Sequence, residues 1–125
     1  MPVRDRGAAI VDFVLVGALT TVLFVGVLQV ALALHVRATM VDCAAEGARH
    51  GALADRTPQD GADRTRALLE LSLSSSYAAD VRAEHTVVGG LEVVRVQVRA
   101  PLPVLGLLGP SGTLTVDGHA LREHP

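Results

Sequence analysis

The chain has 125 residues, half of them hydrophobic, and a formal net charge of −2 from 11 basic and 13 acidic side chains. A chain without a basic excess offers no electrostatic footprint for nucleic acid, so no nucleic-acid partner is expected. Cys43, the single cysteine, excludes an intramolecular disulfide framework and a paired-cysteine metal or redox motif.

A short polar segment, residues 1–7, precedes the longest apolar stretch of the chain. After Asp12 no charged side chain occurs until Arg37, and Phe13 to Leu34 contains nothing more polar than two threonines and a glutamine. A helix needs about 20 apolar residues to cross a bilayer. We therefore predict a basic leader over residues 1–7 and a transmembrane helix over residues 8–34.

The charges that flank the apolar stretch set its expected orientation. Arg4 and Arg6 precede it, while Arg37 follows it. Because basic residues are retained on the cytoplasmic side, the N-terminus is expected in the cytoplasm. Residues 35–125 would then form an extracytoplasmic domain of a single-pass membrane protein, since the stretch is too long for an ordinary signal sequence.

Helical character continues past the apolar stretch. Residues 35–54 contain no proline and are rich in alanine, so we predict one helix from about residue 8 to 54. Cys43 would be a small buried apolar residue, with an intermolecular disulfide or a lipid attachment as alternatives. The face expected to pack against the rest of the domain consists of Val36, Met40, Cys43, Gly47, Gly51 and Ala54.

A second helix is expected to begin after Thr57. Thr57 can cap it, Pro58 suits the first helical position, and Asp60 lies three residues after the cap. The helix should extend to about Leu73 and end at a serine linker, Ser74–Ser76. Its buried side is predicted to consist of Ala67, Leu68, Leu71 and Leu73.

The hydrophobic period then changes to that of strands. Residues 81–87 and 94–99 alternate between apolar and polar side chains, and Gly89-Gly90 between them is typical of a two-residue hairpin. Pro101 should end the second strand, an apolar loop or a short turn of helix is expected over residues 104–110, and a third strand over residues 113–121. The predicted inward residues are Val81, Ala83, His85, Val87, Val94, Val96, Val98, Leu114 and Val116.

These elements predict an α+β fold with a small antiparallel sheet. The polar face of the hairpin carries Arg95 and Arg99, which we expect to be solvated or to form a subunit contact.

Residues 7–12 read GAAIVD. Small pilins and pseudopilins resemble this layout, with a basic leader, a glycine, and an apolar helix whose fifth mature residue is acidic. By this resemblance a prepilin peptidase would cut between Gly7 and Ala8, and Asp12 would become the fifth residue. A carboxylate within an apolar bundle costs about 2.5–3.5 kcal/mol on insertion scales, and pairing with the new α-amino group of a neighbouring subunit would offset this cost. The alternative is that Asp12 is solvated at the interface and only ends the span.

The order of several segments resembles the TadE-like family, minor pseudopilins of the tight-adherence (Tad or Flp) pilus, a type IV-like system. The segments are RGAAIVDFVLV at residues 6–16, AAEGARHGAL at residues 44–53, and a C-terminal pattern of strand, apolar loop and closing strand from Val96 to Arg122 and Glu123. Two positions depart from the family. Asp12 stands where Glu is usual, and Ala45 stands where Arg is common.

The resemblance implies a pilin-like fold and a structural function. The chain would be a minor pseudopilin or an assembly factor of the pilus, acting by lateral packing of its membrane helix. It would reside in the cell membrane, or in the pilus after processing. The implied partners are the membrane, pilin and sister pseudopilin subunits, the prepilin peptidase and the Tad secretion platform.

No motif predicts an enzyme. Histidines 35, 50, 85, 119 and 124 lack metal-ligand spacing, and no nucleophile elbow or phosphate loop occurs. We therefore expect no metal, cofactor or small-molecule substrate. Two other hypotheses stay open: an uncleaved, membrane-anchored interaction domain of a secretion complex, and a small secreted domain preceded by a signal sequence.

Overall fold

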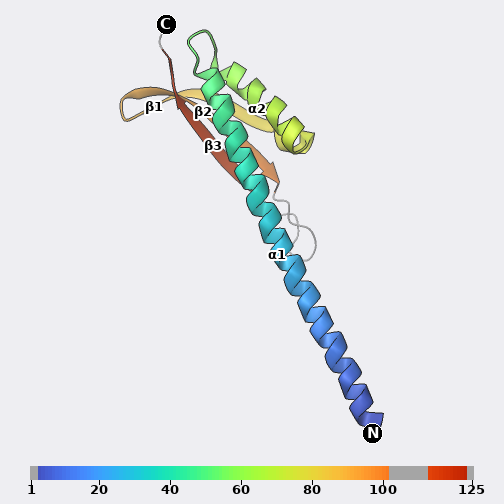
Figure 1. Cartoon of the computed structure of the whole chain (residues 1–125). Helices are drawn as coiled ribbons and strands as arrows, with labels where there is room; N and C mark the ends of the chain where they lie inside the picture. Colours follow the sequence, from blue (N-terminus) through green and yellow to red (C-terminus); the bar gives the residue numbers. More distant parts are fainter. Residues whose placement is uncertain (1–2, 102–112, 124–125) are drawn as a thin grey trace. The chain divides into compact units, whose positions relative to one another are not determined.

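The computed structural model describes residues 3–101 and 113–123, with side chains from residue 5 onward. The chain divides into two compact units, Met1–Leu32 (unit 1) and Ala33–Pro125 (unit 2). One helix, α1 (Val3–Gly51), supplies all described residues of unit 1 and the first element of unit 2 (Figure 1). The predicted α+β fold is confirmed, since α1 is followed by a short helix and a three-stranded antiparallel sheet.

The predicted long helix is confirmed, but both of its ends are displaced. It begins at Val3, inside the predicted leader, because no proline interrupts residues 3–7. It ends at Gly51 instead of Ala54. The Ala52 N–H still bonds to the carbonyl of Ala48 at 2.9 Å, after which the chain turns toward the second helix.

The second helix, α2 (Pro58–Ser72), begins where the sequence predicts. Thr57 and Asp60 form a complete capping box: the Thr57 N–H donates to Asp60 Oδ2 at 2.8 Å, and the Asp60 N–H donates to Thr57 Oγ1 at 3.2 Å. Leu73 follows as the C-cap, with its N–H bonded to the carbonyl of Leu69 at 2.8 Å.

The predicted buried side of α2 is wrong for Ala67 and Leu71 and partly right for Leu68 and Leu73, which are half-buried and pack against the core. Leu71 is 85% exposed, Ala67 is exposed, and Leu68 is only half-buried. The buried residues are instead Gly61, Ala62, Thr65 and Leu69. Small residues lie inward because α2 packs backbone to backbone against α1: a Cβ on Gly61 would meet the Gly47 carbonyl oxygen at 2.7 Å.

The hairpin is confirmed. Strands β1 (Asp80–Val88) and β2 (Leu91–Pro101) pair antiparallel around Gly89 and Gly90, whose φ angles are +60° and +82°. Positive φ at both central positions is the type I′ geometry that favours glycine. Strand β3 (Thr113–Leu121) pairs antiparallel with the other edge of β2, so the order is β1-β2-β3.

The inward alternation of β2 and β3 is confirmed, whereas that of β1 holds only for its first half. Val81 is buried and Ala83 partly buried, but His85 and Val87 are exposed. In Figure 1 the hairpin end of β1 lies clear of both helices, so these two side chains have no layer to pack against. The serine linker lies at a short 3-10 turn, η1 (Ser75–Ala78), and the apolar loop predicted over residues 104–110 lies outside the described residues.

The core of unit 2 lies between the sheet and both helices, which pack on one face of the sheet (Figure 1). Met40, Leu69, Val94, Val96 and Val98 are the largest apolar side chains buried there. The helix face predicted for α1 is confirmed except for Ala54, which is exposed. A second row of small residues, which the sequence did not identify, completes that face: Ala44 and Ala48 on α1, and Ala52 directly after it.

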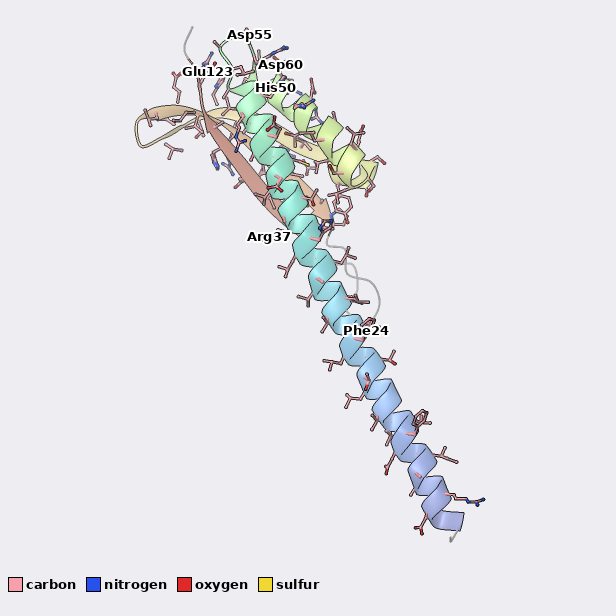
Figure 2. The ribbon with its side chains drawn as sticks, in the orientation of Figure 1. Phe24, Arg37, His50, Asp55, Asp60 and Glu123 are labelled. Atoms are coloured by element: carbon pink, nitrogen blue, oxygen red, sulfur yellow. The ribbon has the colours of Figure 1, made fainter. Side chains whose placement is uncertain are left out.

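Strand β3 and the second half of α1 run in the same direction through unit 2. Gly118 of β3 lies against the backbone of Ala44 and Ala45 of α1. Further along both elements, the Glu123 N–H donates to the carbonyl of Ala52 at 2.7 Å. Figure 2 shows Glu123 and His50 at the same end of unit 2. Beyond β3, the Arg122 N–H continues the pairing with the carbonyl of Glu92 at 3.0 Å.

Candidate functional site

The candidate site is the N-terminal part of α1, which contains Gly7, Ala8 and Asp12. From Asp5 to Leu32 every residue is exposed except Gln29, which is half-buried. Large apolar side chains stand on all sides of this helix, such as Phe13, 79% exposed, and Phe24, labelled in Figure 2. A soluble protein would bury such a helix in its core, so the exposed apolar surface indicates an environment outside this chain.

That environment fits a membrane. The helix is long and apolar enough to span a bilayer, and none of its most apolar window is buried. The protein therefore has one candidate N-terminal membrane helix among its described residues. The absence of burial separates this helix from the core helix of a soluble protein.

Polar groups in the apolar stretch are few. Thr21 donates its hydroxyl to the Gly17 carbonyl at 2.8 Å, so the hydroxyl is satisfied within the helix itself. Asp12 lies two turns into α1 with an exposed side chain. It forms no ion pair or hydrogen bond with another side chain among the described residues. A carboxylate in this setting has to find water or a cation from outside the described residues.

Gly7 and Ala8 lie inside α1, on exposed helix. A Cβ added to Gly7 would meet nothing within 4 Å. Four glycines of unit 2 behave differently. A Cβ at Gly47, Gly61 or Gly118 would overlap backbone or Thr65, and a Cβ at Gly51 would lie 3.0 Å from the Gly61 Cα, closer than an ordinary contact. The fold of this chain therefore explains those four glycines and does not explain Gly7.

Other reactive groups do not form a second candidate. Cys43 is buried on α1, and the pKa of its thiol is raised chiefly by desolvation, with the Asp42 charge adding to the rise and a hydrogen bond from Ser72 opposing it. A thiol with a raised pKa is a poor nucleophile at neutral pH. Within the described part of the chain, no group of three or more His, Cys, Asp or Glu side chains could hold a metal ion.

The sequence pattern that begins at Gly7 agrees with a known family. The model of the TadE-like protein family matches residues 7–49. The chain is similar to TadE-like proteins over this stretch, and the resemblance seen in the sequence is confirmed there. Neither the curated proteins nor the solved structures gave a match.

The TadE-like stretch coincides with α1 from Gly7 to Arg49. It thus includes Gly7, Ala8 and Asp12, together with the part of α1 that packs into unit 2. The match is consistent with a TadE-like protein of Tad pilus systems. The exposed apolar helix and this match together indicate a membrane-anchored protein related to those systems.

Proposed function

We propose that this chain is a minor pseudopilin or an assembly factor of a Tad-type pilus, with a structural function and no catalytic one. The observation that carries the proposal is the TadE-like match beginning at Gly7 on a helix whose apolar surface has no partner within the described chain. Such a helix can be held by lipid and later packed against other helices, because both environments are equally apolar.

The first step of the proposed mechanism is cleavage between Gly7 and Ala8 by a prepilin peptidase. Both residues are exposed, and Gly7 has no packing reason within the fold. A glycine at this position supports the proposal, because it lowers the cost of unwinding the helix for cleavage by about 1 kcal/mol relative to Ala. The neighbouring residues Asp5 and Arg6 are exposed as well, so no packing of their side chains would resist this unwinding.

The second step is lateral packing, in which Asp12 pairs with the α-amino group of Ala8 from a neighbouring subunit. Removing a carboxylate from water into an apolar bundle is costly unless a cation accompanies it. Cleavage creates such a cation at residue 8 while leaving Asp12 near the new N-terminus. The pairing would join subunits in register.

The proposed topology has the N-terminus in the cytoplasm and unit 2 outside it. Arg4 and Arg6 precede the apolar stretch, and the positive-inside rule counts them. The proposed partners are pilin and sister pseudopilin subunits, the prepilin peptidase and the Tad secretion platform. Each would meet the membrane helix or unit 2 during assembly.

N-terminal sequencing of the protein recovered from membranes and from sheared pili tests the cleavage step. Ala8 as the first residue is the expected result. A start at Met1 or Pro2 would contradict cleavage and favour an uncleaved, membrane-anchored interaction domain. A start beyond about residue 34 would instead indicate a signal sequence, which is removed with the apolar segment.

Substitution of Asp12 tests the assembly step. Asp12→Ala should insert into the membrane normally but be absent from the pilus fraction, measured by immunoblotting of membrane and pilus fractions. Asp12→Glu, the matched control, retains the charge and should be recovered in pili. Equal recovery of Asp12→Ala and the unaltered protein would refute the pairing role.

A further inference from the structure

We propose that the face of the sheet opposite the helices binds a second copy of this chain, with the two sheets packed face to face about a two-fold axis parallel to the strands. This outer face is formed by the even-numbered residues of β1 and the odd-numbered residues of β2 and β3. The proposal does not depend on cleavage at Gly7 or on assembly into a pilus.

The outer face carries an apolar cluster at its hairpin end, made of Val88, Leu91, Val93 and Leu121. Val93 is only 6% exposed although it is not part of the core of unit 2. The register places Val93 beside Leu121, and Leu91 beside Val88. Leu91 and Leu121 are 57% and 62% exposed, so the cluster has a buried centre and an open apolar surface. Such a surface is typical of a protein contact.

The remainder of the outer face is charged but balanced. Arg95 of β2 lies between two carboxylates, 3.4 Å from Glu84 and 3.6 Å from Asp117. Arg82, which is ion-paired with Asp80 at 3.3 Å, and Arg99 supply the other positive charges, and Asp80 supplies the other negative one. A face of one sign would repel its own copy, whereas a face with equal numbers of each sign can pair with itself.

The register decides how the charges would meet. Arg82, Gln97 and Asp117 lie in one row across the three strands. A two-fold axis along β2 places β1 of one copy over β3 of the other at the same height. Arg82 then faces Asp117 of the second copy, and Gln97 faces itself across the axis.

The neighbouring rows are also compatible with this arrangement. The row of Glu84, Arg95 and His119 places Glu84 over His119 of the second copy. Arg95 approaches its own counterpart with its charge compensated by two carboxylates. Arg99 lies at the end of β2 farthest from the apolar cluster, and there it also approaches its own counterpart. The dimer therefore depends on attraction at the outer strands and on the apolar contact, which oppose the like charges at its centre.

The direction of α1 favours this axis over edge-to-edge pairing. In unit 2, β3 runs parallel to α1, as the contacts of Gly118 with Ala44 and of Glu123 with Ala52 show. A two-fold axis along the strands leaves α1 entering both copies of unit 2 from the same side, as two copies anchored in one membrane require. Antiparallel pairing of two β3 edges would reverse α1 in one copy.

Cross-linking of the full chain in detergent micelles and in membranes tests the proposal. Gln97→Cys should form a covalent dimer with a short bis-maleimide, because Gln97 lies on the axis. Ala67→Cys, on the exposed surface of α2, is the matched control and should give no covalent dimer. The parent chain should also give none, because its Cys43 is buried.

Reversal of the charges at positions 82 and 117 tests whether the partner is a second copy of this chain. In the Gln97→Cys chain, Arg82→Glu or Asp117→Arg should each reduce the dimer yield at least about tenfold, because like charges then face each other twice. Mixing the two variants, which carry tags of different size, should restore a mixed dimer. The carboxylate introduced at position 82 of one chain then faces the guanidinium introduced at position 117 of the other. Rescue by mixing cannot arise from misfolding.

Three outcomes would overturn the proposal. The first is no dimer of Gln97→Cys under conditions in which the cysteine reacts with a monofunctional maleimide. The second is a mixture of the two charge variants that cross-links no better than either variant alone. The third is a cross-linked product in membranes that joins this chain only to a different protein, which would show that the outer face binds another partner.

Discussion

At the scale of single residues, the glycines divide into those that close packing requires and those that packing does not explain. Gly118 lies against the backbone of Ala44 and Ala45, and Gly47 lies against Thr65 and the carbonyl of Gly61. The Thr65 hydroxyl donates to that same Gly61 carbonyl at 2.8 Å, so both helices meet around one buried polar contact. Sequence pattern alone could not distinguish these glycines from Gly7, because steric need depends on contacts between distant segments.

Substitution of Gly118 by alanine is expected to destabilise unit 2. The new methyl group would overlap backbone atoms of α1, which cannot rotate away as a side chain can. Overpacking of this kind costs about 1–3 kcal/mol, and more where backbone must move. Thermal unfolding followed by circular dichroism should therefore show a lower midpoint for Gly118→Ala.

Gly26→Ala is the matched control for Gly118→Ala. Gly26 lies in the apolar helix, where an added methyl group would meet nothing within 4 Å. Alanine also favours a helix by about 1 kcal/mol over glycine. The midpoint of unit 2 should be unchanged, and equal losses in both variants would contradict the steric argument.

At the scale of elements, capping and turn signals predicted where helices and strands begin and end. The hydrophobic pattern was less successful in predicting which face of α2 is buried. Thr57, Pro58 and Asp60 located the start of α2, and Gly89-Gly90 located the hairpin. These signals depend on interactions between residues a few positions apart, so they can be recognised from the sequence alone.

The buried face of α2 could not be predicted from its own sequence, because it depends on a contact with a distant segment of the chain. The leucines were expected to face inward, but Leu71 is among the most exposed side chains. The close approach of Gly61 to Gly47 fixes the rotation of α2 about its axis, and leucine positions follow from it. In the same way, the outer apolar cluster became visible only when the register brought Val93 and Leu121 together.

The capping box makes the stability of α2 dependent on pH. Hydrogen bonds from the Thr57 backbone and hydroxyl to the Asp60 carboxylate hold the pKa of that carboxyl below its ordinary value of 3.8. A pKa lowered in the folded state means that the folded protein binds the proton less readily than the unfolded chain. The stabilisation is therefore complete above about pH 4 and is lost as pH falls through the lower folded pKa.

Asp60→Asn tests this dependence. The variant should unfold at lower urea concentration than the unaltered protein at pH 7, because the carboxylate is absent. The difference between their midpoints should shrink as the pH is lowered below about 4. Glu70→Gln, at an exposed position of α2 outside the capping box, is the control. A difference that stays constant with pH would show that the Asp60 charge contributes nothing to the cap.

At the scale of the whole molecule, the two units have opposite surface chemistry. Described residues of unit 1 carry their apolar side chains outward, and unit 2 buries its own in a core between helices and sheet. All buried members of that core lie between Val36 and Val116. The described residues of unit 1 therefore contribute no side chain to the core, and folding of unit 2 should not require them.

A chain that begins at Ala33 is expected to fold without the apolar segment. It keeps α1 from Ala33 to Gly51 and every residue of the core. Circular dichroism should show helix and strand, and thermal unfolding should be a single cooperative transition, as expected for a small domain with an intact core.

A chain that begins at Val41 is the matched control, because it lacks Val36 and Met40. Met40 is among the largest fully buried side chains, and loss of one such residue costs about 2–5 kcal/mol. A domain of this size has about 5–15 kcal/mol of stability, so the shorter chain should be largely unfolded or melt far lower. If the chain from Ala33 unfolds equally, the apolar helix would be required for the fold of unit 2 and could not act only in the membrane. If it folds, the core of unit 2 forms without the apolar helix.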